Sequence, residues 1–449
     1  MSELPPAWEW TTLQDLAAAE PRAMTDGPFG SNLKSSHYVD SGPRVIRLQN
    51  IGFGEFVDEK AHITESHFEA LRAHEARPGD LVVASLGQDL PRACLVPPTL
   101  GPAIVKADCI RVRLHPSLDS RYVSYALQRP DLRHAVADQI HGVGRPRLGM
   151  AGIKELSIPV PPRAEQERIV AAIEEHLSRL AAAEAAAMSA ERRIKALEKA
   201  VITQASSTLA PPSHWKAVSV ADAGSVGLGL QRSPKRHSGP NMRPYLRVAN
   251  VFEDRIDDSD VMLMDMTDAE WERFKLRDGD VLLNEGQTPE LLGRPAIYRG
   301  DPPDVAFTNS LIRFQANDAV DPEWALLVFR SHMHNRRFMR ESQITTNIAH
   351  LAAGRFKTVE FPLPPLDEQR ACVSEARAGL EACARLRGEV VAGRTRSAGL
   401  RRSILAAAFS GRLVPQDSAD EPASVVLERI RAEREAVAPT KRTRKAKAS

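Results

Sequence analysis

The chain has 449 residues, a hydrophobic fraction of 43%, a charged fraction of 26% and a formal net charge of +2. This length allows two or three domains with hydrophobic cores of their own, and the composition is that of an ordinary globular protein. Because the chain is nearly neutral, it is no polycation, and a surface for nucleic acid would have to be local.

Short runs rich in Val, Ile and Leu alternate with Gly/Pro turns in the first domain-sized stretch. This pattern predicts β-strands at 44–51, 80–85 and 104–114. A more helical piece follows, with a break near Pro130, and a polar Gly/Arg loop, HGVGRPRLG, leads into a strand-like exit, KELSIPVPP. We expect these elements to form a globular domain over residues 1–160.

A single long helix is predicted between Pro161 and Leu209. The segment has no glycine, and no proline after Pro162, and good helix formers dominate it. Apolar residues recur at three- and four-residue steps, the period of an amphipathic helix: Ile169, Ile173, Leu177, Leu180, Ala187, Ile194, Leu197 and Val201. At 1.5 Å per residue the helix would be roughly 65 Å long, well beyond the mean helix of a globular domain.

The same order of elements returns about two hundred residues later. Arg47 and Asn50 recur as Arg247 and Asn250, RPGDLVVAS recurs as LRDGDVLLNEG, and IPVPPRAEQERI recurs as FPLPPLDEQRAC. A period of this length is too long for a solenoid. It indicates two similar domains, each followed by a long helix.

The duplication predicts an α+β fold in which two similar globular α/β domains are separated by two long helices. We expect the helices to pack as an antiparallel, coiled-coil-like pair, with a pseudo-twofold internal repeat. The expected order is a first domain at 1–160, a first helix at 161–209, a second domain at 210–363, a second helix at 364–411 and a polar tail at 412–449.

The second helix, from Leu366 to Phe409, contains Gly379, Gly388, Gly393 and Gly399, and each glycine costs up to about 1 kcal/mol relative to Ala. We expect packing on the first helix to stabilise it, because small Ala and Gly faces allow close approach. Two separate, solvated helices are the alternative. The residues expected at the helix starts and in the pair are Glu165, Gln166, Ile173, Leu177, Leu180, Glu368, Gln369, Leu380 and Leu386.

The tail is polar, has one amphipathic stretch and ends in a basic run made of Lys441, Arg442, Arg444, Lys445 and Lys447. We expect this run to be solvated and disordered. An auxiliary contact to phosphate is the alternative.

No complete catalytic or metal-binding motif is found. The sequence DPPD resembles the DPPY tetrad of amino-methyltransferases, but Asp304 replaces the aromatic residue that would stack on the base, so we interpret it as a turn. GPFGSNLKSS is no P-loop, and His62, His67 and His74 lack ligand spacing, so no metal is predicted. The four cysteines show no C-x-x-C spacing, which fits a reducing cytosol, and no apolar run is long enough to span a membrane. We expect a non-catalytic, cytoplasmic protein that binds no cofactor itself.

Loops between the predicted strands carry Arg, Lys, Asn and Gln in both halves of the chain. Arg suits guanine, Asn and Gln suit adenine, and Lys serves phosphates. Solvated surface loops are the alternative for any single residue, and Arg47 and Asn50, which recur on predicted strands, are assigned to the scaffold. The candidate DNA-binding residues are Asn32, Lys34, Gln88, Arg92, Arg145, Arg147, Arg232, Lys235, Arg236, Asn284, Gln287, Arg294, Thr345, Thr346 and Asn347.

Several features together resemble one known family. They are the duplicated plan, the helix starts PPRAEQERI and PPLDEQRAC, the loop GPFGSNLKSSHY and the segment LRRSILAAAFSGRLVPQDSADEPASVVLERIRAERE. Over nearly the whole chain they resemble the specificity subunit of type I restriction-modification systems. The first helix end, ALEKAVITQASSTL, looks like a degenerate counterpart that lacks the AFSG sequence.

The resemblance implies a DNA-reading adaptor for phage defence. Each globular half would be a target recognition domain for one part of a bipartite site in double-stranded DNA, and the helices would bind two modification subunits. Those subunits would carry S-adenosylmethionine and methylate adenines, and motor-nuclease subunits would join for restriction. Two alternatives stay open: an enzyme that itself methylates or cuts DNA, for which no motif is found, and a coiled-coil scaffold without a nucleic-acid role.

Overall fold

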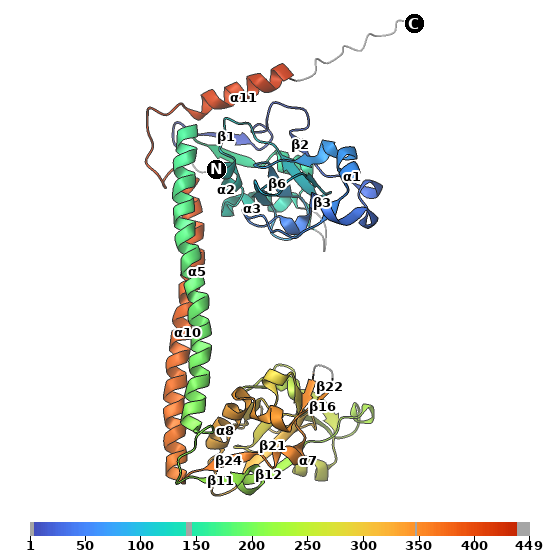
Figure 1. The fold of residues 1–449 in the computed structure, drawn as a ribbon, viewed down its shortest axis with the longest axis vertical. Helices are drawn as coiled ribbons and strands as arrows, with labels where there is room; N and C mark the ends of the chain where they lie inside the picture. The colour runs from blue at the N-terminus through green and yellow to red at the C-terminus, as the bar shows by residue number, and fades with distance from the viewer. Residues whose placement is uncertain (1–3, 141–145, 346–347, 438–449) are drawn as a thin grey trace. The chain divides into compact units, whose positions relative to one another are not determined.

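The computed structural model describes residues 4–140, 146–345 and 348–437. The chain falls into two compact units, here called unit 1 and unit 2. Unit 1 contains Met1–Ala185 and Arg394–Ser449, and unit 2 contains Ala186–Gly393. Each unit combines one mixed α/β domain with half of each of two long helices, α5 (Arg163–Ser206) and α10 (Leu366–Ala408) (Figure 1). The predicted fold class is confirmed.

The first domain is built on two four-stranded sheets. One has the order β2-β9-β6-β7 and is antiparallel, with strands Met24–Thr25, Cys109–Val112, Leu81–Ala84 and Arg92–Leu95. The other has the order β4-β3-β8-β5, with strands His62–Ile63, Tyr38–Ile46, Ala103–Val105 and Glu75–Ala76, and here β3 and β8 are parallel. The remaining elements are β1 (Glu9–Thr12), β10 (Ser157–Val160), α1 (Glu65–Ala70), α2 (Ser120–Ala126), α3 (Pro130–Val136) and α4 (Met150–Lys154).

The second domain repeats this plan. Its four-stranded sheet has the order β12-β21-β17-β19, with strands Gly224–Leu228, Leu311–Ala316, Val281–Asn284 and Pro295–Ile297. A second sheet, β16-β13-β20, consists of Met262–Asp265, Met242–Leu246 and Ala306–Phe307, and its parallel pair β13·β20 repeats the parallel pair β3·β8. A third sheet, β18-β23-β22, consists of Gly286–Gln287, Ile348–His350 and Gln343–Thr345. The remaining elements are β11 (Lys216–Ser219), β14 (Val251–Phe252), β15 (Arg255–Ile256), β24 (Glu360–Leu363), α6 (Val220–Ala223), α7 (Asp268–Phe274), α8 (Pro322–His334) and α9 (Ala353–Phe356).

Two predicted strands differ from the structure. The run at 44–51 ends as a strand at Ile46, and Leu48–Asn50 form a 3-10 turn. The run at 104–114 is divided into β8 and β9, because Asp108 adopts a left-handed backbone conformation with φ 69°. A side chain that can bond locally makes Asp one of the few residues that accept this conformation. The break between β8 and β9 places Asp108 at the candidate site described below.

The two long helices pack antiparallel, as predicted. In unit 2 Glu198 accepts two 2.7 Å bonds from Arg387, and Val201 faces Gly379, so the numbering rises on one helix as it falls on the other. In unit 1 Arg394 forms a 2.6 Å ion pair with Glu184.

Part of the expected packing of the helix pair is wrong. A Cβ at Gly388, Gly393 or Gly399 would have nothing within 4 Å, so of the four glycines in α10 only Gly379 lies at a close approach to α5. Leu386 is 43% exposed and does not fill the pair. Ile173 is fully buried in the core of unit 1, where Leu177 and Leu180 pack beside it, and Leu380 packs on the core of unit 2.

The described part of the tail belongs to the core of unit 1. Helix α11 (Ala423–Val437) buries Ala423, Val426, Leu427 and Ile430 in the same cluster as Trp8. Ala423 N also donates to Ala7 O at 3.0 Å, which ties the helix to the N-terminal segment. The basic run that ends the chain lies outside the described residues.

Candidate nucleic-acid interface

The start of α5 is attached to the first domain by its Glu–Gln pair. Trp8 Nε1–H donates to Glu165 Oε2 at 3.0 Å. The fully buried Gln166 side chain accepts from Asp119 N at 2.9 Å and donates to Pro161 O at 3.0 Å. Since Asp119 caps α2, the pair fixes that helix against the start of α5.

The start of α10 carries the same attachment. Trp215 Nε1–H donates to Glu368 Oε2 at 2.8 Å, and Gln369 Oε1 accepts from Asp321 N, the cap of α8, at 2.8 Å. Gln369 Nε2 donates to Ala319 O at 2.9 Å. These contacts give the repeated Glu–Gln motif a structural role in both units.

Asn50 and Asn250 are scaffold residues, as expected. Asn50 Nδ2 donates to the carbonyls of Val57 and Glu59 at 2.8 Å, and its Oδ1 accepts from Arg47 N at 2.8 Å. Asn250 makes the equivalent three bonds in the second domain. Both side chains are buried and hold a turn rather than a ligand.

In the first domain the ends of β2, β6 and β8 meet the start of β9 at one place. Asp108 N donates to Asp26 Oδ1 at 2.9 Å, Ser85 N donates to Asp108 O at 2.9 Å, and Gly87 N donates to Pro146 O at 3.0 Å. We call this edge, residues 26–27, 85–88, 106–108 and 146–147, the first rim.

The first rim carries charged side chains. Arg147 forms an ion pair with Asp108, and the two side chains are 48% and 19% exposed. Burial raises the pKa of Asp26, against the hydrogen bond from Gly27 N and the positive charge of Arg147. The exposed guanidinium of Arg147 therefore lies next to the carboxylates of Asp26 and Asp108.

The second domain has an equivalent edge, the second rim, formed by residues 228–229, 285–287, 308–310 and 349–350. Glu285 N donates to Ser310 O at 3.0 Å and Leu351 N donates to Glu285 O at 2.8 Å. Here His350, paired with Gly286 on the adjacent strand, places Nδ1 3.3 Å from Glu285 Oε2. Their side chains are 43% and 29% exposed.

The structure brings some of the predicted first-domain residues together and separates others. Gln88 and Arg147 lie on the first rim, and Asn32 and Lys34 are exposed in the loop that leaves it. Arg92 is half-buried and donates from Nη1 to Ile51 O at 3.0 Å, so it already serves the fold. Arg145 lies outside the described residues.

In the second domain Gln287 lies on the second rim, and Arg232 and Lys235 are exposed. Arg294 is half-buried with its guanidinium 4.6 Å from the Phe252 ring centroid, and burial lowers its pKa. Arg236 forms a 2.7 Å ion pair with Glu270. Thr345 ends β22, and Thr346 and Asn347 lie outside the described residues.

Asn284 is a wrong prediction. Its side chain is fully buried and Nδ2 lies 3.4 Å from Val251 O, because it ends the buried strand β17 instead of starting a surface loop. Sequence reasoning also missed Asp26, Asp108 and Glu285, since it collected basic, amide and threonine residues and no carboxylates. Comparing the loop positions of the two repeats one by one would have exposed these carboxylates.

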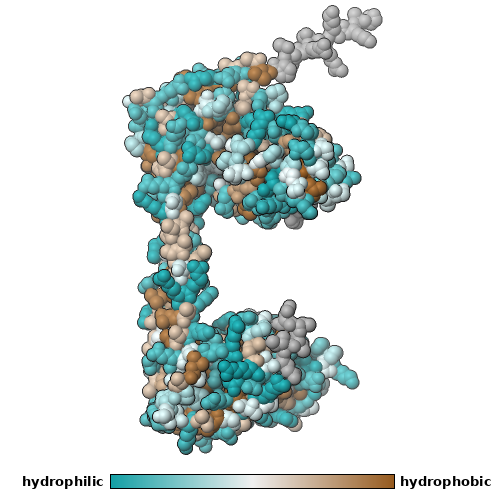
Figure 2. All heavy atoms as spheres, in the orientation of Figure 1, coloured by the Kyte–Doolittle hydropathy of each residue, from teal (hydrophilic) through white to brown (hydrophobic). Residues whose placement is uncertain are grey.

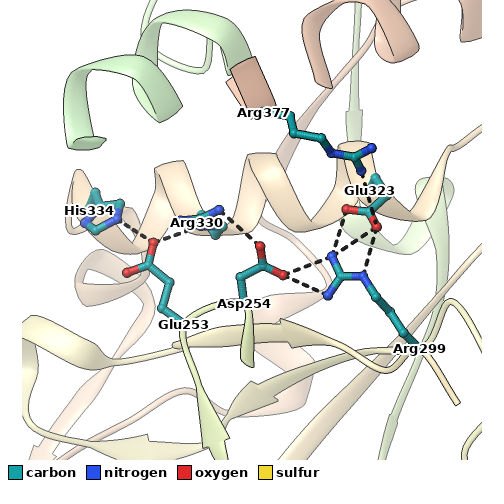
Figure 3. A network of polar contacts seen from close by, with 7 residues as sticks. All are labelled: Glu253, Asp254, Arg299, Glu323, Arg330, His334 and Arg377. Carbon is teal, nitrogen blue, oxygen red and sulfur yellow. Dashed lines mark hydrogen bonds and ion pairs between the residues drawn. The ribbon is translucent and has the colours of Figure 1, made fainter. Parts of the chain in front are cut away.

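An ion-pair network lies where the second domain meets α10 (Figure 3). Arg330 Nε donates to Glu253 Oε1 at 2.8 Å, and Arg299 bridges Asp254 and Glu323 at 3.0 Å each. His334 and Arg377 complete the network. Burial opposes ionisation of Glu253, but the hydrogen bond from His334 and the charge of Arg330 outweigh it and lower its pKa.

The first domain has no copy of this network among its described residues. Gln128 occupies the position of Arg330, nine residues after the helix cap in each domain. Arg121 pairs with Glu174 of α5 at 3.3 Å, where Glu323 pairs with Arg377 of α10 at 3.9 Å, so the two charges are exchanged. The junction of domain and helix is thus similar in backbone and different in charge.

The helix pair exposes hydrophobic side chains. Met188, Leu197 and Leu386 of unit 2 are 43%, 46% and 43% exposed. Figure 2 shows hydrophobic residues on the surface of the long helices. Among the described residues no helix is both long and apolar enough to cross a membrane.

Comparison with known proteins finds relatives of one kind along nearly the whole chain. The type I restriction enzyme EcoKI specificity subunit of Escherichia coli (strain K12) is 24% identical over 89% of this chain and 90% of the relative. The StySPI specificity subunit of Salmonella potsdam is 23% identical over 90% of this chain and 91% of the relative.

The chain is similar to type I specificity subunits. No protein-family model matches it. A solved structure from work on complex assembly and conformational transition of the type I R-M system shares the fold, with a TM-score of 0.68, 18% identity and coverage of 92% of this chain and 100% of that chain. The resemblance to type I specificity subunits expected from the sequence is confirmed.

Proposed function

We propose that this chain is the DNA-recognition subunit of a type I restriction-modification complex. Each domain reads one half of a bipartite site in double-stranded DNA through its rim and the adjoining loops. The observation that carries this proposal is the duplication itself, since two domains with one scaffold present different side chains at equivalent rims. The likeness to type I specificity subunits supports it over 89% of the chain.

The helix pair docks two methyltransferase subunits. Its exposed Met188, Leu197 and Leu386 support this assignment, because apolar side chains of this size on a helix surface favour a protein partner. S-adenosylmethionine binds to those partner subunits and not to this chain, and motor-nuclease subunits complete the assembly for restriction.

The chain itself does no chemistry. The DPPD sequence that resembles a methyltransferase tetrad is a turn, in which Asp304 has φ 50° and pairs with Lys275 at 2.5 Å.

The experiment is to map methylated adenines genome-wide in a host that carries the methyltransferase subunits with and without this chain. We expect methylation at one bipartite motif only when the chain is present. Replacing residues 1–160 by the first domain of a relative should change one half of that motif. Methyl transfer by the purified chain alone, or a change in both halves, would contradict the proposal.

A further inference from the structure

The two rims share one backbone. Gly27 and Gly229 approach the neighbouring strand so closely that a Cβ would lie 2.1 Å from Lys106 C in the first domain and 2.4 Å from Phe307 O in the second. No other residue fits without a shift of the main chain. The backbone bonds between strand ends recur as well, as described above.

The side chains on this backbone differ in chemistry. Equivalent rim positions hold Asp26 and Leu228, Lys106 and Thr308, Asp108 and Ser310, and Arg147 and His350. Several scaffold positions away from the rims keep their residue type, as in Asn50 and Asn250, Asp80 and Asp280, and Gln166 and Gln369, although the junctions with α5 and α10 differ in charge. A constant scaffold under variable side chains is expected where two copies of a domain bind different sequences.

Each rim nevertheless keeps one acid–base pair, and the basic residue occupies the same position. Arg147 and His350 both precede a fully buried leucine, Leu148 or Leu351. The backbone N–H of each leucine donates to the equivalent strand end, Ser85 O or Glu285 O, at 2.8 Å. The acid comes from a different strand end in each domain, Asp108 in one and Glu285 in the other.

We propose that Asp108–Arg147 and Glu285–His350 are the specificity-determining pairs of the two half-sites, each with its basic residue directed at a base edge. This inference rests on the proposed function and names the residues that carry it. Guanine is the base expected for Arg147, since a guanidinium donates two parallel bonds to guanine O6 and N7. The Asp108 carboxylate holds the guanidinium plane in place before DNA arrives, which lowers the entropy lost on binding.

Two ion pairs of the scaffold are closed to a ligand. Asp80 and Asp280 are held by Arg113 and Arg313, whose side chains are 17% and 15% exposed against 4% for each aspartate. In the rim pairs the basic side chain is 48% or 43% exposed, so its donors remain open to a ligand.

The test uses the assembled methyltransferase complex with Arg147→Ala, Arg147→Lys and His350→Ala. Methylation mapping and competition binding read out the motif. Arg147→Ala should make one base pair of the first half-site degenerate and weaken cognate binding about ten- to a hundredfold. Arg147→Lys should keep DNA binding but relax the same base pair, because a point charge cannot form the bidentate contact. His350→Ala should relax the second half alone.

Matched controls are Arg77→Ala and Arg277→Ala, exposed residues in the turns that precede β6 and β17, at the strand ends opposite the rims. These should leave the motif unchanged. An unchanged motif in both Arg147 variants and in His350→Ala would overturn the inference, as would relaxation in the wrong half. Loss of all DNA binding in both Arg147 variants would also overturn it, because base readers leave phosphate contacts intact. Failure of the proposed function is distinguishable, since the wild-type complex would then methylate no bipartite site.

Discussion

Gly379 on α10 packs directly against Val201 on α5: a Cβ at Gly379 would lie 2.8 Å from Val201 Cγ1. Gly388, on the same helix and in the same unit, would place its Cβ in open space. Gly388→Ala should therefore stabilise unit 2 by about 1 kcal/mol, the cost of glycine in a helix interior. Gly379→Ala should not stabilise unit 2, because the added methyl group would clash with Val201. Urea unfolding of both variants decides the point, and equal stabilisation would mean that the helix pair relaxes around residue 379.

Glu165 and Glu368 accept equivalent tryptophan bonds, but their pKa values move in opposite directions from the ordinary 4.5. Burial raises the pKa of Glu165, whereas hydrogen bonds from Trp215 and His214 lower the pKa of Glu368. The folded protein thus favours protonated Glu165, and its contribution to stability falls as pH rises from 4.5 through the folded pKa. The contribution of Glu368 is present above 4.5 and is lost as pH falls through its folded pKa.

Glutamine variants separate the two carboxylates. Glu368→Gln should destabilise unit 2 most near neutral pH, and the loss should fade in acid. Glu165→Gln should show the opposite trend, with its smallest cost near neutral pH. Thermal unfolding of both variants between about pH 3 and pH 7 measures this. Parallel pH profiles would show that the two sites are electrostatically alike.

Arg330 is the most buried cation of the network in Figure 3, with 13% of its side chain exposed. The variant Arg330→Gln gives the second domain the residue that the first domain has at the equivalent position, Gln128. It removes the 2.8 Å partner of Glu253 and leaves His334, at 2.9 Å, as the remaining partner of that carboxylate. Because a partly buried carboxylate then loses its permanent countercharge, the variant should destabilise unit 2 by about 2 kcal/mol. Arg340→Gln, at an exposed position, is the control and should cost less than about 0.5 kcal/mol. Chemical denaturation compares the two, and similar losses would remove the network from the stability of unit 2.

The length of the helices should set the distance between the two half-sites, if the proposed function holds. Four residues inserted after Ala185 in α5 and after Gly393 in α10 lengthen the pair by about 6 Å. We expect the gap in the methylated motif to widen by about one to two base steps of 3.4 Å, with both half-sites unchanged. Methylation mapping of the variant measures the gap. If the gap between the half-sites stays the same, the helices bind partner subunits but do not set the spacing.

The sequence predicted the elements whose signals are local. Proline pairs and a long amphipathic period placed the start of α5 within two residues, and the left-handed Ser207 ends it near the expected Leu209. The contacts between residues that are distant in sequence could not be predicted, because no local pattern marks them. The sequence around Glu165 does not show that its hydrogen-bond partner is Trp8. The sequence around Asn284 does not show that the end of β17 is buried.

The candidate site was predicted in part for the same reason. Arg147 was found because basic loop residues suit DNA, but its partner Asp108 was hidden inside a run interpreted as one strand. The left-handed turn at Asp108 breaks that run and brings the carboxylate to the first rim. Such a turn depends on the neighbouring strands as much as on the residue.

The docking of α11 has a consequence for the order of synthesis. Ile430 completes a core that begins with Trp8, and His115 Nε2 lies 2.9 Å from Glu433 Oε2. A ribosome adding about 5–20 residues per second needs tens of seconds after the first domain emerges before this helix exists. Unit 2, although later in sequence, has all its residues sooner. Chains released from the ribosome after Gly393 should therefore show a protease-resistant second domain beside a first domain that is still cleaved. Equal protection of both domains would refute this timing.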